Sequence, residues 1–207
     1  LPPTEIQLTN FLKAFSENPA KAKLDLIDSL LSSHHFGEKW GRHWLDVARY
    51  ADSNGKDRNI YNFHAWRYRD YVIDSFNRDI PFDRFVKEQI AGDLLPSHSR
   101  EERDRNLIAT GFLALGSKSF EESKPEVFRM DVIDEQIELV SRSVLGLSVG
   151  CARCHNHKFD PIPQEDYYAL QSVFAAVDRT EVRYHREPEL LAQAARIGAD
   201  AGFDEIN

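Results

Sequence analysis

Along most of the chain, hydrophobic residues recur at spacings of three and four, whereas alternation with a period of two is rare. Spacings of three and four place apolar side chains on one face of an α-helix. We therefore expect an all-α fold without a β-sheet, as a multi-helix single domain. The expected helices are 4–15, 19–32, 36–50, 63–77, 82–94, 100–115, 125–148 and 164–177.

Several of these helices carry start signals at their first turn. Asn62 is placed to cap the helix that holds Trp66. Pro81 and Pro163 stand where two later helices begin, a position that proline favours because it has no amide hydrogen to leave unpaired. The longest loops are expected near 51–61 and 116–124, which are rich in Gly, Ser, Asn and Lys.

The domain organisation follows from a change in composition after about Arg186, where Ala, Gly and acidic residues dominate. We expect a helical domain over 1–185 and a tail, linker or start of a following domain over 186–207. The chain begins Leu-Pro-Pro-Thr, without an initiator methionine or a signal peptide. This start favours a processed product or an excised segment. No run of eighteen apolar residues occurs, so no transmembrane segment is expected.

The range 36–50 has the most pronounced apolar face. Trp40, His43 and Trp44 fall on it at helical spacing, so His43 is expected to lie between two buried tryptophans. The side chains that we expect to find buried are Trp40, Trp44, Trp66, Ile137, Val140 and Phe174.

Composition narrows the class of protein. The 207 residues include 42% hydrophobic and 29% charged residues, which is typical of a globular chain. Lys and Arg number 26 and Asp and Glu 34, which gives a net charge of −8. A surface of this sign repels phosphate, so no nucleic-acid partner is expected.

Both cysteines of the chain lie in one run, Cys151-Ala152-Arg153-Cys154-His155. C-x-x-C-H is the pattern of covalent c-type haem attachment. The two sulfurs form thioethers with the haem vinyl groups, and the adjacent histidine binds the iron. The run predicts one covalent haem c on Cys151 and Cys154, with His155 as its proximal ligand, in the connection between two helices.

A second histidine leaves other interpretations open. Cys151, Cys154, His155 and His157 are also a possible ligand set for a structural zinc ion. A redox dithiol is a third interpretation, although such a pair normally occurs in a βαβ context. With haem bound, His157 is expected to hydrogen-bond a propionate or to orient the loop.

The sixth iron ligand has to come from a histidine or a methionine. We rank His43 first, Met130 second and His64 third. A buried histidine satisfied by one hydrogen bond is the alternative role for His43, and a core methionine is the alternative for Met130. The helices 36–50, 63–77 and 125–148 are expected to wall the cofactor.

Two arginines and several other histidines complete the set of candidates. Arg67 and Arg69 are candidates for binding the haem propionates, because guanidinium groups pair with carboxylates. Ordinary surface ion pairs are the alternative for both. The histidines in polar stretches are expected to be solvated: His34, His35, His98 and His185.

Several longer stretches resemble one of the planctomycete cytochrome c-like domain families of unknown function. These stretches are 1–4, 36–40, 43–53, 66–73, 76–79, 81–86, 89–96 and 145–150, the last of which leads into C-x-x-C-H-x-H-K-x-D-P. The resemblance covers 1–182. It implies a periplasmic or extracellular, exported multidomain protein, with another cytochrome-like domain before this one and further domains after it.

The sequence is therefore consistent with three functions. The first is a haem-binding domain that transfers electrons in an extracellular oxidation, with other redox domains of the same polypeptide or a redox protein as partners. The second is a haem enzyme with an open distal site that handles peroxide or oxidises a substrate. The third is a structural or interaction module that holds zinc or no metal.

Overall fold

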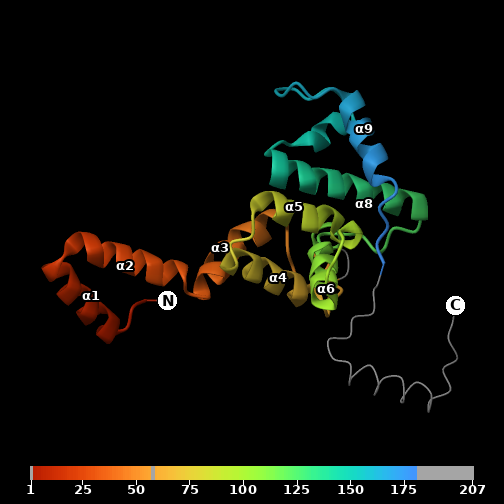
Figure 1. Ribbon diagram of the computed structural model, residues 1–207. Helices are drawn as coiled ribbons and strands as arrows, with labels where there is room; N and C mark the ends of the chain where they lie inside the picture. Colours follow the sequence, from red (N-terminus) through yellow and green to blue (C-terminus); the bar gives the residue numbers. More distant parts are fainter. Residues whose placement is uncertain (1, 57–58, 181–207) are drawn as a thin grey trace, which may run out of the picture. The chain divides into compact units, whose positions relative to one another are not determined.

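The computed structural model describes residues 2–56 and 59–180, and in these ranges the chain is helical (Figure 1). The chain divides into two units, 1–177 and 178–207. The expected boundary at 185 lies outside the described residues and stays a prediction. The helices are α1 (Glu5–Glu17), α2 (Pro19–Leu31), α3 (His35–Val47), α4 (Ala65–Asn77), α5 (Phe82–Ala91), η1 (Gly92–Leu94), α6 (Arg100–Ala109), α7 (Gly111–Ala114), α8 (Pro125–Val140), η2 (Ser141–Leu145), η3 (Val149–Arg153) and α9 (Gln164–Phe174).

The all-α expectation is confirmed. Over the described ranges the only β-type pairing is an isolated bridge between Ser53 and Tyr61. None of the helices in these ranges has the length and apolar character needed to cross a bilayer.

The helix ends differ from the expected ones where the backbone turns left-handed. α3 stops at Val47 rather than residue 50, because Arg49 takes a positive φ of 55°. The expected helix 125–148 is α-helical only to Val140. It continues as the π-helical turn η2 and ends before Gly146, whose φ is 68°. Periodicity does not report such single-residue changes in φ.

Side-chain caps mark the starts of α1, α2 and α6. Thr4 and Gln7 form a reciprocal capping box on α1. Asn18 accepts the Lys21 amide at the start of α2. The expected cap at Asn62 is wrong, because α4 begins at Ala65 with His64 in the cap position. Pro81 and Pro163 immediately precede α5 and α9, as expected.

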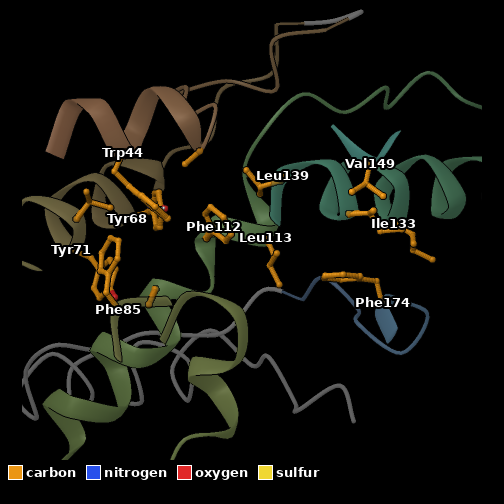
Figure 2. Close-up of a cluster of buried hydrophobic side chains, with 14 of the residues drawn as sticks. Trp44, Tyr68, Tyr71, Phe85, Phe112, Leu113, Ile133, Leu139, Val149 and Phe174 are labelled. Carbon is orange, nitrogen blue, oxygen red and sulfur yellow. Dashed lines mark hydrogen bonds between the residues drawn. The ribbon is translucent and has the colours of Figure 1, made fainter. Parts of the chain in front are cut away.

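A hydrophobic core, rich in aromatic side chains from α3, α4 and α5, joins α3 through α9 (Figure 2). Trp44 packs edge-on against Phe85 and is stacked on Phe112. Tyr71 and Phe85 face each other with an interplanar angle of 3°. Each fully buried aromatic or aliphatic side chain in such a core contributes about 1.5–3 kcal/mol.

Half of the expected burials are found. Trp44, Ile137 and Phe174 are buried, and Val140 is half-buried. The other two tryptophans are not buried: Trp40 is 50% exposed and Trp66 is 40% exposed. The apolar stripes of their helices are wider than the faces that neighbouring helices cover.

His43 also differs from expectation, because it is exposed. Its ring lies against Trp40 at a centroid distance of 5.3 Å, and Trp40 is itself half exposed. His43 therefore lies beside one exposed tryptophan rather than between two buried ones. α3 presents its buried face, with Gly37, Gly41 and Trp44, on the side next to α4.

We expect alkaline pH to destabilise the fold. Burial raises the pKa of Tyr68 and Tyr71 above the ordinary tyrosine value. A raised pKa in the folded state means that these phenols stabilise the protein below the unfolded pKa of about 10, and that this stability is lost as the pH rises through the folded pKa. Urea unfolding should give a lower free energy of unfolding at about pH 11 than at about pH 8. Equal free energies of unfolding at the two pH values would contradict the expected loss of stability. The control is Tyr61→Phe, which removes an exposed phenol and should leave the loss between the two pH values unchanged.

Candidate functional site

The two cysteines lie on the short 3₁₀-helix η3 and its C-terminal cap. Cys151 is within η3, and Cys154 is the residue after its last turn. A 3₁₀-helix has three residues per turn, so side chains at i and i+3 project to the same side. Both cysteines are free and exposed. Both thiols therefore lie in or directly after one short turn and are accessible to solvent.

His155 is exposed, and its ring has a defined hydrogen bond. Its Nδ1 lies 2.7 Å from the carbonyl oxygen of Asn156. A carbonyl oxygen only accepts, so Nδ1 carries the hydrogen and donates. In the neutral ring this leaves the lone pair on Nε2 free. A histidine that ligates a metal is normally held in this way by its second nitrogen.

His157 has the opposite arrangement. Its side chain is only 7% exposed, and Nδ1 accepts hydrogen bonds from the amides of Phe159 (3.2 Å) and Asp160 (2.8 Å). Its Nε2 lies 3.5 Å from Ser148 Oγ. These contacts support the expected loop-orienting role of His157, because they connect the residues before and after the C-x-x-C-H run.

α8 holds the start of the motif from one side. Asp134 pairs with Arg153 at 2.5 Å, and Glu138 Oε2 accepts the Gly150 amide at 2.9 Å. A side chain at position 150 would place its Cβ 2.7 Å from the Glu138 carboxylate, so a larger residue just before Cys151 would push that carboxylate aside.

α9 holds the end of the motif. The Gln164 side chain and the Tyr168 hydroxyl both donate to the Arg153 carbonyl, at 3.0 and 3.1 Å. The Gln164 amide donates to Asn156 Oδ1 at 2.9 Å. The motif is therefore fixed by two helices, although its reactive side chains face solvent.

The helices next to the motif differ from the three expected walls. η3 packs against α8 and α9, whereas the main partner of α3 is α4. Of the expected walls, α8 alone has extensive contact with η3. The sequence did not predict that α9 would pack against the motif, because apolar residues on a helix face do not show which element covers them.

The candidates for the sixth ligand lie on three different elements, and all three are exposed. His43 is on α3, and His64 precedes α4. Met130 is on α8, one helical turn before Asp134, which pairs with Arg153 of the motif. Met130 thus lies on a helix that contacts the motif. Its role as a ligand stays a prediction, as do those of His43 and His64.

Arg67 and Arg69 have partners close to them on α4. The Arg67 guanidinium lies over the Trp66 ring, 5.2 Å from its centroid. Arg69 donates two hydrogen bonds to Asp70 Oδ1. Local contacts of this kind match the surface-pair interpretation, and propionate binding by either arginine stays a prediction.

Metal-ligating atoms of the motif do not converge. Over the described residues, His34, His35 and Glu38 are the group of His, Cys, Asp or Glu side chains whose ligand atoms all lie within 4.8 Å of one another. Cys151, Cys154, His155 and His157 form no such group, and the geometry adds no support to the zinc interpretation.

Sequence reasoning missed the residues that hold the motif in place. Asp134, Glu138 and Gln164 look like ordinary exposed positions of amphipathic helices, and no local pattern marks them. Gly150 offered a signal, because a glycine directly before an attachment cysteine indicates a close contact.

The family of the chain follows from comparison with known proteins. A search of the curated proteins and a search of the solved structures each found no match. A family model matches residues 1–179, and its description is PSCyt2, protein of unknown function (DUF1549). This match covers most of the chain and agrees with the resemblance to a planctomycete-type domain of unknown function. The chain therefore belongs to the DUF1549 family.

Proposed function

We propose that this domain binds one haem c covalently through Cys151 and Cys154, with His155 as the proximal iron ligand, and that it transfers electrons. The observation that carries the proposal is the state of His155 beside two exposed thiols. Its Nδ1 donates to a backbone carbonyl and its Nε2 is free, as a proximal ligand requires.

The surroundings of the motif fit a bound haem in a second respect. Phe159, four residues after His155, is 84% exposed, although its ring contacts His157. Single exposed apolar side chains are common on protein surfaces, so Phe159 is available to a cofactor but does not by itself require one. A flat apolar cofactor on the motif would bury part of its surface.

Haem c supplies a one-electron redox centre when it is bound. The protein's own residues would attach it, orient the proximal imidazole and hold the loop still. The contacts from Asp134, Glu138 and Gln164 serve the last of these roles. Because the attachment residues face solvent, a bound haem would be accessible to a redox partner.

We expect His155→Ala to keep the covalent pigment but to change the iron. The two thioethers do not depend on the imidazole, so haem should remain attached. Loss of the proximal nitrogen should shift the oxidised absorption spectrum toward high-spin iron, and added imidazole should restore it. The matched control is His98→Ala, another exposed histidine. An unchanged spectrum in His155→Ala would contradict the assignment of His155.

We propose Met130 ahead of His43 as the sixth ligand. Met130 lies on α8, the helix that pairs with Arg153 of the motif, whereas His43 lies beside Trp40 on α3. The proposed order is therefore Met130, His43, His64, which reverses the first two ranks expected from the sequence.

A haem enzyme is the second candidate function. The exposure of all three candidate ligands favours it, because none is held in a buried wall of the kind that fixes a strong sixth ligand. An iron with an open distal face would bind peroxide or a small substrate. Free binding of cyanide by the wild-type protein would support this function over electron transfer.

We also propose a cellular location and a class of partner for this domain. Covalent haem attachment implies an exported, periplasmic or extracellular protein whose partners are other redox domains of the same polypeptide or a separate redox protein. The net charge of −8 favours a partner with a basic docking surface. A structural module with zinc is the third candidate.

A further inference from the structure

A second cluster of chemically active side chains lies at the start of α3. His34 precedes the helix, His35 is its first residue, and Glu38 follows one turn later. Their ligand atoms lie within 4.8 Å of one another. The two imidazole rings are 3.9 Å apart between centroids, and His35 Nδ1 lies 2.7 Å from Glu38 Oε2.

The spacing of these residues follows from helical geometry. His34 already has helical dihedral angles, with φ −58° and ψ −23°. His34 and Glu38 are therefore four positions apart along helical backbone, and His35 and Glu38 are three positions apart. Side chains at both spacings lie on one face of a helix.

The turn that carries the cluster is fixed to α4. Asn77 donates from Nδ2 to the His34 carbonyl at 3.0 Å and accepts the Gly37 amide at 2.8 Å. A Cβ on Gly37 would lie 2.3 Å from the Ile73 carbonyl oxygen, so this close approach requires glycine. Preorganised backbone of this kind lowers the cost of bringing ligands together on a metal ion.

From this cluster we infer a binding site for a divalent transition cation, with Zn²⁺ as the best-suited ion. Two imidazoles and one carboxylate are a known zinc ligand set, which leaves a fourth position open. Ligand atoms at about 2.0–2.2 Å from one tetrahedral ion lie roughly 3.3 Å apart. The distance of 2.7 Å between His35 Nδ1 and Glu38 Oε2 requires only a small outward shift.

The charges around the cluster predict moderate affinity. The exposed Glu38 side chain offers a carboxylate oxygen as the anionic ligand of the set. Lys39 and Arg42 line the same shallow hollow as His35 and Glu38. Their positive charges weaken cation binding and favour an anion in the fourth position. We therefore expect micromolar rather than nanomolar affinity for Zn²⁺.

Calorimetric titration with Zn²⁺ tests the inference, using protein that carries Cys151→Ser and Cys154→Ser so that no thiolate competes. We expect one equivalent to bind, and His34→Ala, His35→Ala or Glu38→Gln to weaken binding by about tenfold or more. Titration with Co²⁺ should give visible d–d bands without a sulfur-to-metal charge-transfer band.

The matched control is His98→Ala, an exposed histidine just before α6 that has no role in either proposed site. It should bind Zn²⁺ like the parent protein. Circular dichroism shows whether each variant is folded, and Glu38→Gln, which keeps the side-chain shape, replaces any alanine variant that is not. No heat of binding in the parent protein, or equal binding by all three cluster variants and the control, would overturn the inference.

Discussion

Serine at both position 151 and position 154 is expected to abolish covalent pigment in protein exported by a host that matures c-type cytochromes. The hydroxyl group of serine does not form the thioether that holds the haem. Each single variant should retain pigment through one remaining thioether, at lower yield. Extraction with acidified organic solvent measures the result, because it removes haem that is not covalently bound.

The double variant should still fold, which separates loss of attachment from loss of structure. Both thiols are exposed and neither belongs to the hydrophobic core. Surface substitutions of this kind usually change the free energy of unfolding by less than about 0.5 kcal/mol. Pigment that stays with the folded double variant after extraction would contradict attachment at these cysteines.

Glu88→Ala is expected to have the largest effect on stability. Glu88 is fully buried on α5, and its carboxylate accepts hydrogen bonds from Tyr71 (2.9 Å), Arg84 (2.7 Å) and Arg105 (2.7 Å). Arg105 is only 15% exposed and also lies over the Tyr71 ring. Removing the carboxylate leaves this guanidinium without its buried counter-ion, and breaking such a pair costs about 3–5 kcal/mol.

Urea unfolding followed by circular dichroism measures this effect. Asp83→Ala is the control on the same helix, because its partner Lys87 is exposed. That pair should contribute less than about 1 kcal/mol. Glu88→Gln, which keeps the shape of the side chain, should fall between the two. Similar losses for Glu88→Ala and Asp83→Ala would contradict the role given to the buried carboxylate.

The helices could be predicted from the sequence because each buries one apolar stripe, and a stripe is a local pattern. α2, α5 and α9 start within a residue of their expected positions. The network around Glu88 could not be predicted in this way, because its members lie on α4, α5 and α6 and meet only in the folded chain. Periodicity shows which face of a helix is apolar but not which neighbour covers it, and the exposure of Trp40 follows from that gap.

In the candidate site, too, local patterns could be predicted from the sequence and long-range contacts could not. Cys151, Cys154 and His155 lie within five consecutive positions, so their chemistry could be predicted from the local sequence alone. The contacts that hold them, from Asp134 on α8 and Gln164 on α9, join positions 8 or more residues apart and carry no local signal. The cluster of His34, His35 and Glu38 is local, but its three side chains converge only because α3 begins at His35.

An absorption spectrum of the exported wild-type protein, oxidised and reduced, tests the central claim most directly. The account predicts a Soret band and sharp reduced α and β bands that remain with the polypeptide after extraction in acidified organic solvent. A colourless protein, a pigment that the solvent removes, or one equivalent of zinc bound through the two cysteines would contradict it.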